Sequence, residues 1–169
     1  MASLLALTAT ATPALAIRGE IPRGFLLYEH KTIGDLKVGR TGRVAARTVE
    51  LSRQETTGLK EQVILYSTPA MAQRALREFK AAWKRCGHRK GFAQTLTEAS
   101  AGEESRRTFT TRDGGVEDDE AIITRTANAV YVYLRPPTKT SVKPLLRDSR
   151  AMTAKICDIA DCVDLVGAR

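Results

Sequence analysis

Residues able to do nucleophilic or metal chemistry are few and scattered in this chain. Its 169 residues include two histidines, His30 and His88, and three cysteines, Cys86, Cys157 and Cys162. A nucleophile needs a base beside it, and the two histidines lie in very different sequence contexts. Neither histidine has the spacing to other ligands that zinc sites require. We therefore expect no metal, no cofactor and no catalytic activity.

The cysteines favour a different chemistry. In an oxidising compartment, three cysteines predict one disulfide and one leftover thiol, and three pairings are possible. Cys157 and Cys162 are close in sequence but would point in different directions on an uninterrupted helix, so a bridge between them requires the helix to end there. Cys86 could instead reach the last helix. The residues alone leave these alternatives open.

Two other segments have the residue types of ligand-binding loops but lack the residue spacing of such loops. The segment 38–43, VGRTGR, has glycines but neither the spacing nor the strand-to-helix context of a phosphate-binding loop. The segment 113–120, DGGVEDDE, could offer oxygen ligands to Ca²⁺, but its acidic residues do not follow a calcium-loop pattern. We expect a solvated turn between two strands at 113–120.

Positive charge is the clearest surface property of the chain. Lys and Arg total 27 and Asp and Glu total 19, which gives a net charge of +8. Such a surface favours anionic partners, although a solvated helix face is the simpler interpretation. For an exported protein, lipid headgroups or wall polymers fit better than nucleic acid, and we expect no nucleic-acid partner. The anionic-surface candidates lie on one helix face: Arg74, Arg77, Lys80, Lys84 and Arg85.

The elements that position these residues follow from hydrophobic periodicity. A strand is predicted at 62–66, and an apolar stripe at helical spacing predicts a helix from Pro69 to Cys86, with Gly87 as its stop. A second helix is expected from Pro144 to about Cys162. Further strands are expected at 92–97, 106–112, 121–126 and 129–134, the last two joined by a tight turn at 127–128. We expect an irregular strand or two in 35–52 and a polar connector at 54–60.

This order of elements predicts an α+β fold. Sequential strands with short turns form an antiparallel β-sheet, and two main amphipathic helices would pack on it, on one face. The uncharged residues 1–16 end in Ala14-Leu15-Ala16, which predicts a signal peptide at 1–16 and a single domain at 17–169. No Lys or Arg precedes the apolar part of this leader, and a disordered Ala/Thr tail is the alternative. No other segment is long and apolar enough to be transmembrane.

Four elements together resemble the PknH-like extracellular sensor domain family. They are a strand ending in Tyr66-Ser67, a helix ending in W-x-x-C at Trp83 to Cys86, the hairpin AIITRTANAVYVYL and the closing segment MTAKICDIADCV. The resemblance implies an antiparallel sheet flanked by helices, disulfide stapling and a cleft for an unidentified ligand. Members typically carry another cysteine upstream, which the segment 44–53 lacks. The resemblance therefore favours Cys157–Cys162 as the disulfide and Cys86 as the free thiol.

The resulting prediction is a secreted, non-catalytic ligand-binding or sensor-type domain. Its ligand-binding residues are not identified by the sequence, and its partner would be an extracellular ligand, an anionic envelope component or another protein. Two alternatives stay open: a small secreted hydrolase that uses carboxylates or the leftover thiol, and a basic protein that associates with anionic cell-envelope surfaces.

Overall fold

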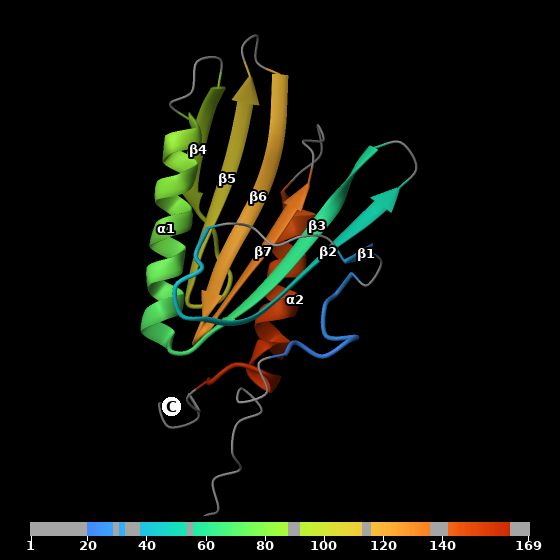
Figure 1. Ribbon diagram of the computed structural model, residues 1–169. Helices are drawn as coiled ribbons and strands as arrows, with labels where there is room; N and C mark the ends of the chain where they lie inside the picture. Colours follow the sequence, from blue (N-terminus) through green and yellow to red (C-terminus); the bar gives the residue numbers. More distant parts are fainter. Residues whose placement is uncertain are drawn as a thin grey trace, which may run out of the picture.

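The structure of the protein, a computed structural model, describes residues 20–28, 31–32, 38–53, 56–87, 92–112, 116–135 and 142–162 (Figure 1). Within these ranges, one antiparallel sheet has the strand order β1-β2-β3-β7-β6-β5-β4. The strands are β1 (Lys31–Thr32), β2 (Arg43–Arg53), β3 (Thr56–Tyr66), β4 (Phe92–Glu98), β5 (Glu104–Arg112), β6 (Val116–Thr126) and β7 (Ala129–Arg135). The helices are α1 (Pro69–Gly87) and α2 (Lys143–Lys155), and a 3₁₀ turn, η2 (Ile156–Asp158), follows α2.

The predicted α+β class is confirmed, but the predicted bounds of β3, β6 and α2 need correction. The predicted connector at 54–60 is wrong, because β3 already begins at Thr56 and pairs there with β2. Its polar residues fit a strand because they meet partners across the ladder: Lys60 lies opposite Glu50, with their charged groups 4.0 Å apart. The predicted signal peptide, residues 1–16, lies outside the described residues.

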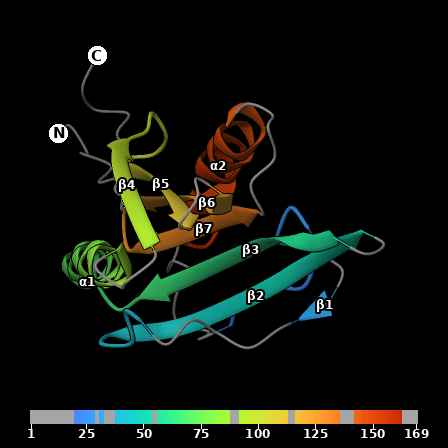
Figure 2. The same cartoon turned by 90° about the horizontal axis from the view of Figure 1, so that it is seen from above.

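The two helices cover opposite faces of the sheet, so the prediction that both pack on one face is wrong. Neighbouring residues of β6 show why: Ile122 packs in the cluster beneath α2, whereas Ile123 packs in the cluster beneath α1. Successive side chains of a strand point to opposite faces, so an unbroken apolar run needs cover on both sides. Figure 2 shows α1 and α2 on the two sides of this part of the sheet.

The segment before β1, residues 20–28, shares the α2 face with α2. We call it the entry segment. Its Ile21, Phe25 and Leu26 are buried in the same cluster as Leu145 and other apolar residues of α2. The entry segment is therefore part of the core.

The C-terminal end of α2 is also shorter than predicted. The α-helix ends at Lys155 instead of near Cys162, and η2 turns the chain back. Cys157 and Cys162, whose Cα atoms are 5.3 Å apart, are joined there by a disulfide. The Asp161 N–H donates to the Asn128 side-chain oxygen at 2.8 Å, which fixes this turn against the β6–β7 turn.

Candidate functional site

The basic residues singled out in the sequence do not form one uniform positive stripe. Arg74 pairs with Glu78 one turn along α1, at 3.0 Å, and Lys80 forms an ion pair with Glu104 on β5. The exposed side chains of Arg77, Lys84 and Arg85 have no carboxylate partner among the residues that the structure describes.

Several other candidates lie outside the described residues. The backbone of Cys86 belongs to the last turn of α1, but its side chain is not described, and neither His30 nor His88 is described at all. The free thiol and the hydrolase alternative therefore stay predictions. In the acidic segment, β6 already begins at Val116, and Glu120 is buried rather than in a solvated turn.

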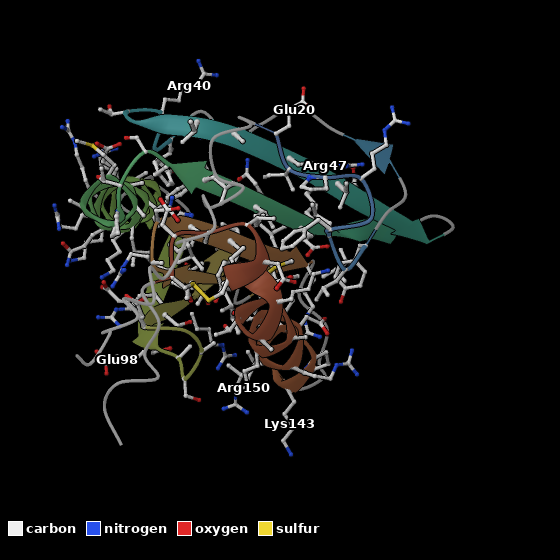
Figure 3. All side chains as sticks on the ribbon, turned by 90° about the horizontal axis from the view of Figure 1, so that it is seen from below. Glu20, Arg40, Arg47, Glu98, Lys143 and Arg150 are labelled. Carbon is white, nitrogen blue, oxygen red and sulfur yellow. A yellow bond between two sulfur atoms is a disulfide. The ribbon has the colours of Figure 1, made fainter. Side chains whose placement is uncertain are left out.

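Two neighbouring cavities lie between α2 and the turn that joins β4 to β5. Their volumes are about 720 Å³ and about 400 Å³, and both are lined by Glu98, Ala99 and Ser100. We call the two together the α2 groove. On the helix side, its lining residues are Val142, Leu146, Arg150, Thr153 and Ala154. Figure 3 labels Arg150 on α2 and Glu98 at the end of β4, one on each wall.

The β4–β5 turn is held firmly against the β6–β7 turn. Gly102 has φ +57° and lies so close to β6 that a Cβ atom there would be 2.5 Å from the Thr124 methyl. The Glu103 carboxylate accepts from the Ala127 N–H at 2.7 Å and pairs with Arg125 at 2.7 Å. One wall of the groove is therefore anchored by backbone contact and by an ion pair.

Linked hydroxyl groups lie at the inner side of the larger cavity. The Ser105 and Thr124 hydroxyls are 2.9 Å apart, and the Thr124 and Ser149 hydroxyls are 2.6 Å apart. The Thr153 hydroxyl donates to the Ser149 carbonyl at 2.9 Å and also bonds the Tyr131 hydroxyl. These bonds satisfy the buried hydroxyls and join α2 to the sheet beneath the groove.

The carboxylates that line the larger cavity already have cationic partners. Glu98 pairs with Arg106 at 3.3 Å, and Glu103 has its pair with Arg125. Glu104 accepts a hydrogen bond from Lys80, and this bond is the main reason that the pKa of the Glu104 carboxyl is lowered.

Arg150 contrasts with these pairs. Its Nε donates to the Ser100 carbonyl at 2.9 Å and its Nη2 to the Ser100 hydroxyl at 2.6 Å, both neutral acceptors. No described carboxylate lies within ion-pair distance of Arg150. The guanidinium therefore connects the two walls of the groove, and its positive charge is not balanced by these uncharged acceptors.

The smaller cavity has a more apolar character. Ile122, Val142 and Leu146 line it together with Ala99, and Arg107 is the cation in its lining. Arg107 is bound at 2.7 Å by the buried Glu120, which also binds Arg135 at 2.8 Å. Sequence reasoning missed Glu120. The available signal was its alternation with Ile122 and Thr124, which puts it on the same covered face.

The chain is similar to a known protein family and to a solved structure. The sequence matches the profile of the family described as PknH-like extracellular domain over residues 37–157. A solved structure, the extracellular domain of PknH from Mycobacterium tuberculosis, is 18% identical with a TM-score of 0.46. The alignment covers 70% of this chain and 65% of that domain, so the chain spans less than two thirds of the solved domain's length. No curated protein matches the chain.

The profile match shows the family and the location of the protein. Among the described residues, no helix is long and apolar enough to cross a bilayer. The matched family is extracellular by its description, and the match spans well over half of the chain. The chain belongs to the PknH-like extracellular domain family, as its sequence motifs predicted, and its location is extracellular.

Proposed function

We propose that this protein is a sensor-type domain that binds a small ligand in the α2 groove and does not transform it. The observation that carries the proposal is the convergence of Arg150, Ser105 and Thr153 on a cavity of about 720 Å³. A concave site with a few converging polar groups is the usual form of a small-molecule site. Both walls are fixed before any ligand arrives, which lowers the entropic cost of binding.

The bonding of the groove's polar groups supports a binding role rather than a catalytic one. A serine nucleophile needs a base that takes its proton, but the Ser105 hydroxyl bonds the Thr124 hydroxyl and the Ile123 carbonyl. The carboxylates that could act as bases are held by Arg and Lys side chains. Polar groups that are already hydrogen-bonded in this way are better suited to position a ligand than to react with it.

The test uses sugars of one ring size and different charge. ¹⁵N-labelled protein is titrated with glucose, glucosamine and glucuronate, and the amide shifts are followed by NMR. We expect at least one sugar to shift amides of residues 98–106 and 150–154 in a saturable way. The variant Ala154→Trp fills the groove with a bulky side chain and should abolish those shifts.

The control variant is Ala151→Trp. Ala151 is exposed on the same helix but does not line either cavity, so this variant should bind as the parent protein does. Shifts that survive in Ala154→Trp, or shifts confined to other surfaces, would contradict the assignment of the groove as the binding site.

A second candidate role is association with anionic envelope surfaces. The observation in its favour is the exposed group Arg77, Lys84 and Arg85 on α1, which has no carboxylate partner among the described residues. Replacement of all three by Gln should remove binding to phosphatidylglycerol vesicles, whereas Arg74→Gln should change it little. Vesicle binding that is insensitive to added salt would refute this role, because exposed charges are screened by salt.

A further inference from the structure

We propose that the ligand of the α2 groove is an anionic amphiphile, with its acidic head at Arg150 and its apolar part in the smaller cavity. The proposal rests on the proposed function and names the chemical class of ligand that this site would take. The shared chemistry is a carboxylate or a phosphate monoester that carries a short hydrocarbon chain.

The charge balance of the larger cavity points to an anionic head. Its lining carboxylates, Glu98, Glu103 and Glu104, are matched by Arg106, Arg125 and Lys80. Arg150 is the lining cation that this matching leaves over, and its hydrogen bonds go to neutral oxygens of Ser100. Of the two arginines that line the larger cavity, Arg106 pairs with Glu98, whereas Arg150 has no carboxylate partner among the residues the structure describes.

The geometry of Arg150 suits an acid better than a neutral ligand. A guanidinium is a fork of N–H donors that binds carboxylate or phosphate by two parallel bonds. The bonds to Ser100 use Nε and one N–H of Nη2, so other donors of the fork stay available. An acid that binds there pairs two charged oxygens with the guanidinium in a partly enclosed site, whereas an alcohol offers it one uncharged oxygen.

The spacing of residues along α2 points to an apolar extension of this head. Val142, Leu146 and Arg150 are four residues apart in turn, so they lie on one side of the helix. Val142 and Leu146 line the smaller cavity with Ile122, and the two cavities meet at residues 98–100. A hydrocarbon chain that begins at Arg150 would therefore meet these apolar side chains within about two helical turns, roughly 11 Å.

The test compares ligands that share a tail or share a head. Octanoate, octyl phosphate, 1-octanol, octylammonium and acetate are titrated into the full chain, below micelle-forming concentrations, by calorimetry and amide shifts. We expect octanoate or octyl phosphate to bind in the groove at least tenfold more tightly than 1-octanol, with octylammonium weaker still. Acetate should bind far more weakly than octanoate, because each buried methylene contributes about a fourfold gain in affinity.

The protein variants separate the head site from the tail site. Arg150→Gln should reduce the affinity for octanoate at least tenfold and bring it close to that of 1-octanol. Arg150→Lys should give an intermediate loss, because the charge stays but the fork is lost. Arg74→Gln removes the same charge on the opposite face of the sheet, where Arg74 pairs with Glu78, and should change the affinity less than twofold. Arg150 is exposed, so these variants should fold as the parent protein does.

The outcomes distinguish this inference from the proposed function. If 1-octanol binds as tightly as octanoate, or if Arg150→Gln leaves octanoate binding unchanged, the anionic head is refuted. If acetate binds as tightly as octanoate, the apolar extension is refuted. If the sugars shift the groove amides but no octyl acid does, the groove stays a binding site and the inference fails. If no probe of either series shifts those amides, both fail.

Discussion

Replacement of Glu61 tests how the entry segment is held on the sheet. The Glu61 side chain is fully buried on β3. Its Oε1 accepts from the Leu27 N–H at 3.0 Å and from the Tyr133 hydroxyl at 2.6 Å, and its Oε2 accepts from the Tyr28 N–H at 2.7 Å. Two of these donors are main-chain groups of an irregular segment. The Glu61 carboxylate therefore accepts the main-chain hydrogen bonds of residues 27–28, which a neighbouring strand would accept in a regular sheet.

The size of the effect follows from the number of donors left without an acceptor. A buried donor left unsatisfied costs about 1–3 kcal/mol, and Glu61→Ala leaves the Leu27 N–H, the Tyr28 N–H and the Tyr133 hydroxyl without this acceptor. We expect Glu61→Ala to lower the free energy of unfolding by about 3–5 kcal/mol, a large part of the ~5–15 kcal/mol typical of a domain. Glu61→Gln keeps one acceptor oxygen but turns an amide donor toward another donor, so we expect a loss of about 1–3 kcal/mol.

The pH dependence gives a second, independent readout. Burial raises the pKa of Glu61 above its ordinary value of 4.5, and hydrogen bonds from Tyr133, Leu27 and Tyr28 oppose this shift without cancelling it. The folded state therefore holds the proton more tightly than the unfolded state. The contribution of this proton to stability is complete below pH 4.5 and is lost as the pH rises from 4.5 through the raised pKa. Across that window, the wild type should lose stability relative to Glu61→Gln.

The assay is urea unfolding of both proteins at several pH values between 4 and 8, with hydrogen exchange of the Leu27 and Tyr28 amides at pH 7. The lowered pKa of Glu104 gives a slope of the opposite sign, but both proteins share it and it cancels in the difference. Glu78→Gln, at a surface pair on α1, serves as the control and should change stability by less than about 0.5 kcal/mol. Parallel pH profiles, together with unchanged exchange at the two amides, would refute the reasoning.

Three further predictions concern turns. Ala127 has φ +49°, and an L-residue in this left-handed region costs about 1–2 kcal/mol. Ala127→Gly should therefore raise the free energy of unfolding, measured in urea, by up to about 1 kcal/mol. A loss of stability would contradict this. Gly102→Ala places a methyl 2.5 Å from Thr124 and should cost about 2 kcal/mol while shifting amides along the β4–β5 turn, and an unchanged spectrum would refute it. Replacement of Cys157 and Cys162 by Ser opens a loop of sequence separation 5 and should cost about 2 kcal/mol in the same assay; a variant as stable as the parent would show that the loop is not constrained in this way.

The parts of the fold that were predicted correctly are those with a local pattern. The strand at 62–66 and the helix after Pro69 follow from periodicity within one segment, and so does the turn at 127–128 between two β-rich runs. Element bounds failed where tertiary partners decide them. β3 extends back to Thr56 because β2 lies beside it, and α2 ends at Lys155 because the chain there turns toward Asn128.

The choice of faces was decided by long-range packing. The runs in β3, β6 and β7 are apolar at successive positions, which indicates burial on both sides of the sheet. This unbroken pattern predicts helices on opposite faces. The groove had no such signal, because its walls come from residues about 50 positions apart, such as Ser100 and Arg150. The basic face of α1 could be predicted because its residues lie close together in sequence. Arg150 could not, because nothing in the sequence distinguishes it from the other arginines.

The arrangement of cover on the sheet explains why a groove forms at this place. On the α2 face, the entry segment and α2 cover β2, β3, β7 and β6, and no described side chain of β4 or β5 belongs to this apolar cluster. Two sides of α2 therefore have different contacts: Leu145 and Met152 pack into the core, whereas Arg150 donates to Ser100 in the turn between β4 and β5. Because these groups occupy different sides of one rigid helix, ligand contacts at Arg150 can change without loss of core packing. Under the proposed function, this separation would let the groove change its ligand while the sheet stays the same.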